Sequence, residues 1–74
     1  MDFELRIEIN KSTKADLKWQ LGEIYLGLMR CYGKENVIYK ECKGKAIVRY
    51  GNIMFAIEEL NNDEYVLYEY FLEP

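Results

Sequence analysis

The sequence predicts a small α+β domain. Three observations lead to this class: a strict alternation of apolar and polar residues at the start of the chain, a long segment with helical periodicity after it, and a hairpin signal near residue 44. With 74 residues the chain has room for a single domain, which we place at residues 1–74. A domain of this size buries only about 60% of its unfolded surface, so surplus apolar side chains are expected outside the core.

The first element is a half-buried strand over residues 2–9. Apolar and charged residues alternate strictly there, so one side of the strand is expected in the core. The predicted core side carries Phe3, Leu5, Ile7 and Ile9.

A helix follows, from about Thr13 to Tyr32. Thr13 is the predicted N-cap with Asp16 as its capping-box partner, and Gly33 is the predicted stop signal. At about 100° per residue, one narrow stripe of this helix is apolar and is expected in the core. The stripe contains Leu17, Leu21, Ile24, Leu28 and Cys31.

The same helix has a second apolar line on nearly the opposite side. It consists of Ala15, Trp19, Gly22 and Leu26. One sheet cannot cover both sides of a helix, so this line is a predicted partner-binding surface. Its small residues allow a partner to approach closely, and tryptophan is enriched at interface hot spots.

The second half of the chain is rich in strand signals. Residues 37–42 and 45–50 are predicted strands joined by a tight turn at Lys43-Gly44, where glycine tolerates a positive φ. Residues 64–72, rich in tyrosine, valine, leucine and phenylalanine, are predicted to form a final strand.

Residues 52–62 decide the layout. We favour a helix there, because Ile53, Ile57 and Leu60 then share a face and residues 56–60 are mostly good helix formers. The result is a ferredoxin-like βαββαβ fold, a four-stranded antiparallel sheet with both helices on one face. The segment also alternates as a strand would, and the alternative is then βαββββ, with one helix packed on a larger antiparallel sheet.

The residue inventory argues against catalysis. There is no histidine, and Ser12 and Thr13 sit where a helix cap is needed. Cys31 and Cys42 form no CxxC motif, and we expect them to be free thiols in core positions unless an oxidising compartment joins them. We therefore expect a protein that is not an enzyme and that holds neither metal nor cofactor.

Charge is distributed unevenly along the chain. Residues 1–50 hold all ten basic residues against seven acidic ones, whereas residues 51–74 hold six acidic residues and no basic one. Such asymmetry fits either pairing within the domain or contact with a charged partner. The chain shows neither a signal-peptide pattern nor an apolar run long enough to cross a membrane, so we expect a cytoplasmic protein without a membrane partner.

The last strand provides a second predicted partner-binding patch, in which aromatic rings lie beside carboxylates. Its residues are Tyr65, Tyr68, Glu69 and Tyr70. If this strand lies at a sheet edge, its free backbone can also extend the sheet of a neighbouring chain.

A candidate phosphate-binding site is the basic hairpin, defined by Lys40, Lys43, Lys45 and Arg49. Residues 43–50 partly resemble the longer ribonucleoprotein motif of RNA-recognition motifs, a resemblance that implies nucleic-acid binding on the sheet face. They depart from that motif at its third and fifth positions, where Lys45 and Ile47 stand in place of base-stacking aromatic rings. Carboxylates of the first strand, expected beside the third, would weaken phosphate binding further.

Together these features predict a non-catalytic protein-protein interaction module. We expect a small inhibitor or adaptor, of the kind encoded by phages and other mobile elements, that occludes a partner protein and forms a homodimer. The alternative is a nucleic-acid-binding accessory protein that contacts phosphates through the 40–49 hairpin.

Overall fold

A computed structural model describes residues 3–73, with side chains from Leu5 onward, and contains one long helix and five strands. The predicted α+β class is confirmed. In chain order the elements are β1 (Phe3–Ser12), α1 (Lys14–Tyr32), a 3-10 turn η1 (Lys34–Asn36), β2 (Val37–Cys42), β3 (Lys45–Tyr50), β4 (Ile53–Asn61) and β5 (Glu64–Leu72).

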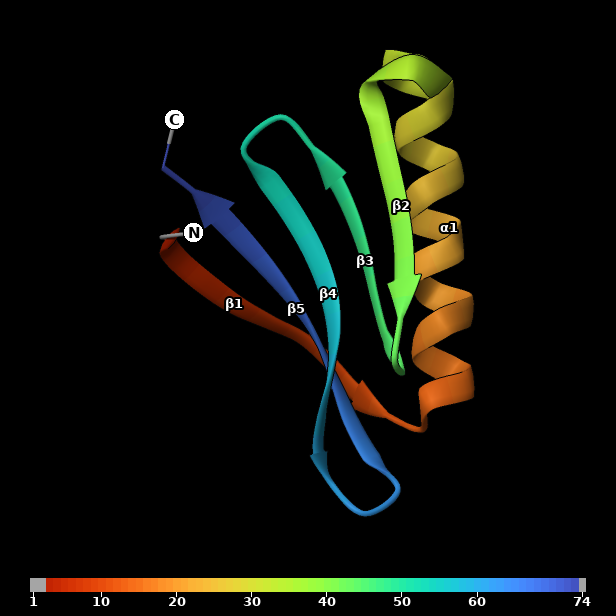
Figure 1. Cartoon of the computed structure of the whole chain (residues 1–74), viewed down its shortest axis with the longest axis vertical. Helices are drawn as coiled ribbons and strands as arrows, with labels where there is room; N and C mark the ends of the chain where they lie inside the picture. The colour runs from red at the N-terminus through yellow and green to blue at the C-terminus, as the bar shows by residue number, and fades with distance from the viewer. Residues whose placement is uncertain (1–2, 74) are drawn as a thin grey trace.

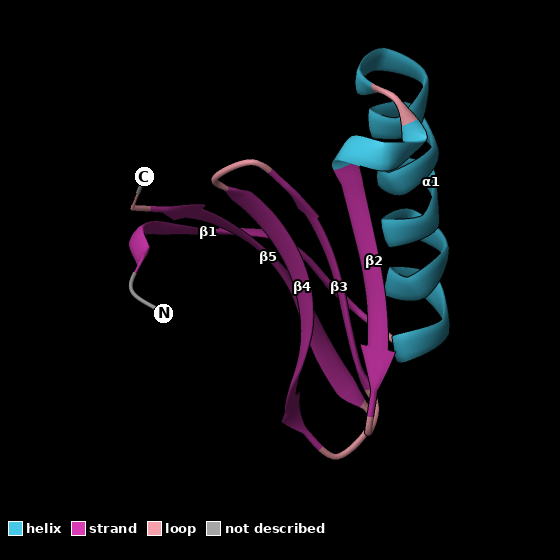
Figure 2. Cartoon of the chain, turned by 45° about the horizontal axis from the view of Figure 1, so that its top comes forward, coloured by secondary structure: helices cyan, strands magenta, loops and turns pink. Residues whose placement is uncertain are grey.

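The five strands form one antiparallel sheet in the order β1-β5-β4-β3-β2. The strands from β2 to β5 are consecutive neighbours, and β1 joins the sheet beside β5. Four successive reversals of direction leave β1 and β2 running the same way at opposite edges, so α1 crosses the sheet to connect them (Figure 1). The helix covers one face only, which we call the helix side, and the other face is the open side (Figure 2).

The structure corrects the prediction for residues 52–62. They form β4 and not a second helix, so the four-stranded ferredoxin-like layout gives way to one helix on a larger sheet, as in the alternative. The physical reason is that β4 lies between two strands and contributes apolar side chains to both faces. Ile57 packs in the core on the helix side, and Ala56 packs on the open side. This two-sided burial outweighs the local helix propensity.

The main core lies between α1 and the sheet. Leu17 and Leu21 of the helix are completely buried, and Ile24 and Leu28 pack around them, as predicted. Tyr25 packs against the same cluster. Their buried partners on the sheet are Val37, Ala46, Val48, Ile57 and Leu67.

The ends of the helix follow the predicted signals. The Thr13 hydroxyl accepts a hydrogen bond from the Asp16 backbone N–H at 3.2 Å, and the Ser12 hydroxyl donates to the Asp16 carboxylate at 2.8 Å. Gly33 has a φ of 92°, and its N–H donates to the Met29 carbonyl at 2.9 Å. The Thr13 hydroxyl thus satisfies a backbone N–H that the helix cannot pair internally.

Two predicted core positions are wrong. Cys31 is exposed, because the last turn of α1 rests on β3 through a stack of Tyr32 on Tyr50 and leaves the thiol outside. Cys42 is exposed as well, because it ends the edge strand β2 on the open side. Both cysteines are free thiols.

The predicted core side of the first strand is also corrected. Leu5, Ile7 and Ile9 are exposed, whereas the side chain of Phe3 lies outside the described part. β1 lies at the sheet edge. α1 begins near the end of β1 and runs alongside β2, so it does not cover the beginning of β1 (Figure 1).

Candidate binding surfaces

The outer face of α1, which we define as Ala15, Trp19, Gly22 and Leu26, points away from the sheet. Trp19 is 72% exposed and Leu26 is 47% exposed. Lys18, Trp19, Gly22, Glu23 and Leu26 line a shallow hollow on this face. A Cβ atom added at Gly22 would meet no atom within 4 Å, so a partner has free access to the helix backbone there.

The predicted aromatic patch on the last strand is divided between the two faces of the sheet. Tyr65 packs against the main core on the helix side, whereas Tyr68 and Tyr70 belong to the open-side cluster. Glu69 pairs with Phe55 across β4, on the helix side. β5 lies between β1 and β4, so both of its edges are hydrogen-bonded and it cannot extend a neighbouring sheet.

Sequence reasoning missed a polar network on the open side. The Arg6 guanidinium lies 4.4 Å from the centroid of the Tyr68 ring, a cation-π contact. The Tyr70 hydroxyl donates a hydrogen bond to the Glu58 carboxylate. Burial, followed by that hydrogen bond, raises the pKa of Tyr70, and a hydrogen bond with Tyr70 raises the pKa of Arg6. The sequence contains no local signal for this network, because its members come from three strands.

The basic hairpin keeps its predicted shape. Lys43 and Gly44 form the turn with φ of 50° and 80°, and the strands on either side have the predicted bounds. Lys40, Cys42, Lys43, Lys45 and Ile47 line a hollow on the hairpin. Arg49 Nε donates a hydrogen bond to the Gly51 carbonyl at 3.0 Å, which holds this side chain near the end of β3.

The carboxylates expected beside the basic hairpin lie elsewhere. β1 carries Glu8 at the opposite edge of the sheet, separated from β3 by two strands. Glu41 of β2 faces the helix, where Lys18 Nζ lies 2.7 Å from its carboxylate. The hydrogen bond from Lys18 and a second from the Tyr39 hydroxyl lower the pKa of Glu41. Burial, together with the bond to Glu41, raises the pKa of Tyr39.

Within residues 3–73, no group of three or more His, Cys, Asp or Glu side chains is placed to hold a metal ion. The one long helix of this described part is too polar to cross a membrane. Ser12 and Thr13 take part in the helix cap described above. No known protein family, curated protein or solved structure matches this chain.

Proposed function

We propose that this chain is a non-catalytic protein-protein interaction module that occludes a partner protein through the outer face of α1. One observation carries the proposal: Trp19 is 72% exposed on a helix whose other side already supplies Leu17 and Leu21 to the core. Tryptophan is enriched among the residues that contribute most to binding at protein interfaces, and exposed apolar patches often mark such interfaces. An exposed tryptophan next to a glycine that no other side chain covers is therefore suited to binding a partner protein.

The partner that fits this surface best is an amphipathic helix. Burying the side chains of Trp19 and Leu26 would contribute on the order of 1.5 to 3 kcal/mol each. Gly22 lies between them and allows two helix backbones to approach closely. Lys18 and Glu23 border the hollow with opposite charges. We therefore expect the partner to be recognised through its apolar side chains and not through a net charge of one sign.

A crosslinking experiment followed by a binding comparison tests this proposal. A photoreactive amino acid at Ala15, which is exposed, would identify proteins that dock beside Trp19 in cells. The decisive measurement is the dissociation constant of a purified crosslinked protein for the wild-type chain, Trp19→Ala and Leu26→Ala. We expect Trp19→Ala to raise it by about thirtyfold or more.

Leu60→Ala is the matched control, because Leu60 is 47% exposed, as Leu26 is, but lies on β4. It should leave the dissociation constant within about twofold of wild type. Unchanged binding by Trp19→Ala, or no crosslinked protein at all, would contradict the proposal.

A second candidate function is phosphate binding by the basic hairpin, as in a nucleic-acid accessory protein. The observation that favours it is that Lys40, Lys45 and Arg49 lie on the open side of β2 and β3. The one carboxylate of these two strands, Glu41, lies on the helix side, where it pairs with Lys18. β4 contributes Glu58 to the same face, where its carboxylate accepts a hydrogen bond from Tyr70. Phosphate groups would therefore meet three cationic side chains on one face of the hairpin.

A salt titration of oligonucleotide binding tests this second function. The double variant Lys43→Glu with Lys45→Glu should weaken binding at low salt and reduce the slope of log affinity against log salt by about two. Lys11→Glu with Lys34→Glu makes the same change in net charge away from the hairpin and should have a much smaller effect. Equal losses in the two double variants, or no affinity at low salt, would exclude the hairpin as a phosphate site.

A further inference from the structure

β1 is an edge strand with an unusual amount of exposed apolar surface. Among the described residues it pairs with β5 alone, so the backbone groups on its other side have no strand partner within residues 3–73. Leu5 is 52% exposed, Ile7 is 40% exposed and Ile9 is 39% exposed. A long edge strand with exposed apolar side chains is a natural site for pairing with another strand.

A regular stretch of β1 runs from Leu5 to Glu8. Over these residues the register with β5 is continuous, and irregularities lie on either side of it. Leu5 stands opposite Phe71 on the helix side, and Arg6 stands opposite Tyr70 on the open side. Ile7 and Glu8 continue this alternation, so each face of the strand has its own chemical character: apolar on the helix side and charged on the open side.

We propose that a second copy of this chain pairs with β1 in antiparallel orientation, about a two-fold axis at Ile7. Such an axis, perpendicular to the sheet, keeps every side chain on its own face. Residues that stand opposite each other must then belong to the same face, which excludes every register in which an apolar position faces a charged one.

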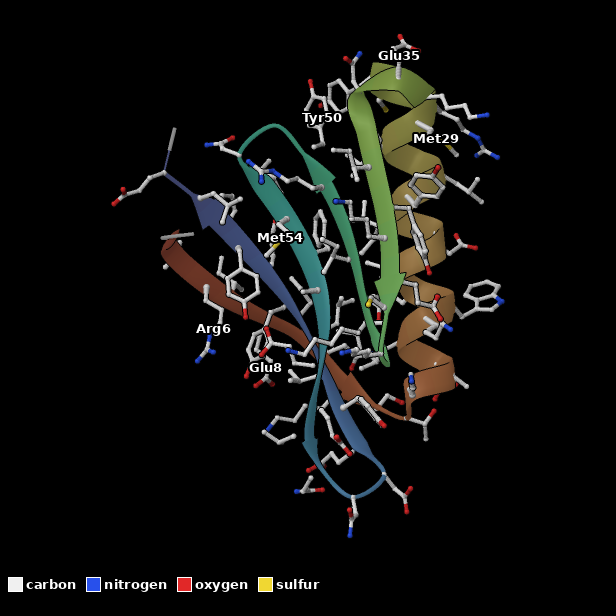
Figure 3. The ribbon with its side chains drawn as sticks, viewed as in Figure 1. Arg6, Glu8, Met29, Glu35, Tyr50 and Met54 are labelled. Atoms are coloured by element: carbon white, nitrogen blue, oxygen red, sulfur yellow. The ribbon has the colours of Figure 1, made fainter. Side chains whose placement is uncertain are left out.

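The charges of the strand favour this one register. With Ile7 opposite Ile7 of the second copy, Arg6 stands opposite Glu8 of that copy, and the same pair forms again across the axis. The two facing Ile7 side chains, each 40% exposed in the single chain, then remove apolar surface from water. Figure 3 shows Arg6 and Glu8 close together along β1. Opposite charges in directly facing positions stabilise strand pairing.

Registers shifted by two residues are opposed by the same charges. A shift in one direction places Arg6 opposite Arg6 of the second copy, and a shift in the other places Glu8 opposite Glu8. Like charges directly across a strand pair are destabilising. The pairing joins two five-stranded sheets into one continuous sheet and leaves the outer face of α1 free, so it does not depend on the function proposed above.

Charge reversal tests the register directly. Arg6→Glu alone and Glu8→Arg alone each replace both attractive pairs with repulsive ones, and each should raise the dimer dissociation constant by about tenfold or more in sedimentation equilibrium. An equimolar mixture of the two variants brings an acidic strand against a basic one. This mixture should form dimers with about the stability of the wild-type dimer. The contact between Arg6 and Tyr68, which Arg6→Glu also removes, lies within one chain and is not part of the interface.

Disulfide trapping provides a second readout. In a chain with Cys31→Ser and Cys42→Ser, Ile7→Cys places two thiols opposite each other at the axis and should give covalent dimers on mild oxidation. Leu5→Cys is the matched control, because its two copies would stand about 14 Å apart and should crosslink poorly.

Three results would overturn the proposal. The first is a wild-type chain that stays monomeric at concentrations up to about 1 mM. The second is a dimer that Trp19→Ala dissociates while the two charge reversals leave it intact, which would place the interface on α1. The third is a mixture of the charge variants that remains monomeric while Ile7→Cys crosslinks no better than Leu5→Cys.

Discussion

The ring of Tyr32 in the last turn of α1 stacks on the ring of Tyr50 at the end of β3, with centroids 4.1 Å apart and ring planes 16° apart. This contact fixes the C-terminal end of the helix to the sheet. Tyr32→Ala should lower the free energy of unfolding by about 1 to 2 kcal/mol in urea titrations, and Tyr32→Phe should change it by less than about 0.5 kcal/mol. Equal losses in the two variants would show that the hydroxyl, not the ring stack, matters.

The two sides of α1 should respond differently to the same substitution. Leu21→Ala creates a cavity in the core and should cost about 2 to 5 kcal/mol of unfolding free energy. Leu26→Ala, on the outer face, should cost less than about 0.5 kcal/mol beyond differences in helix propensity. Chemical denaturation of both variants measures the contrast. A large loss in Leu26→Ala would mean that its side chain packs within its own chain.

The pair formed by Lys18 and Glu41 should be visible in an acid titration. The pKa of Glu41 is lowered below its ordinary value of 4.5, so the pair stabilises the fold fully above that pH and loses its effect as pH falls through the folded-state pKa. Lys18→Gln should return the pKa of Glu41 toward 4.5, and Tyr39→Phe should do so to a smaller extent. Carboxyl NMR titrations measure both shifts, and an unchanged pKa in Lys18→Gln would rule out the pair in solution.

The turn between β2 and β3 should be sensitive to backbone conformation. Gly44 has a φ of 80°, so Gly44→Ala should destabilise the fold by about 1 kcal/mol. Lys43 has a φ of 50°, which asparagine tolerates better than lysine, so Lys43→Asn should be neutral or stabilising by up to about 0.5 kcal/mol. Thermal unfolding should show a lower melting temperature for Gly44→Ala and an unchanged or higher one for Lys43→Asn. A stabilising Gly44→Ala would contradict this turn geometry.

Local signals were sufficient for most elements. The helix cap at Thr13, the stop at Gly33 and the turn at Lys43-Gly44 are short-range devices, and the structure confirms each of them. The outer face of α1 was also predictable, because helical periodicity alone determines which residues share a side. Whether that face binds a partner stays a prediction.

Long-range pairing decided the remaining features. Residues 52–62 satisfy helical and strand patterns alike, and only pairing with strands on both sides selects the strand. The sequence also contains no signal for the place of β1 beside β5. Because β1 lies beside β5, its carboxylates are far from the basic hairpin, where the sequence had placed them. The same position leaves Leu5 and Ile7 exposed at a sheet edge.

The sequence alone determined that the long helix has apolar residues on opposite sides and that a tight basic hairpin follows it. Tertiary structure alone decided which strands are neighbours, which edge stays open and which faces the aromatic residues of β5 occupy. The reason is that periodicity and turn chemistry act within a few residues, whereas strand order depends on contacts between segments far apart in the chain.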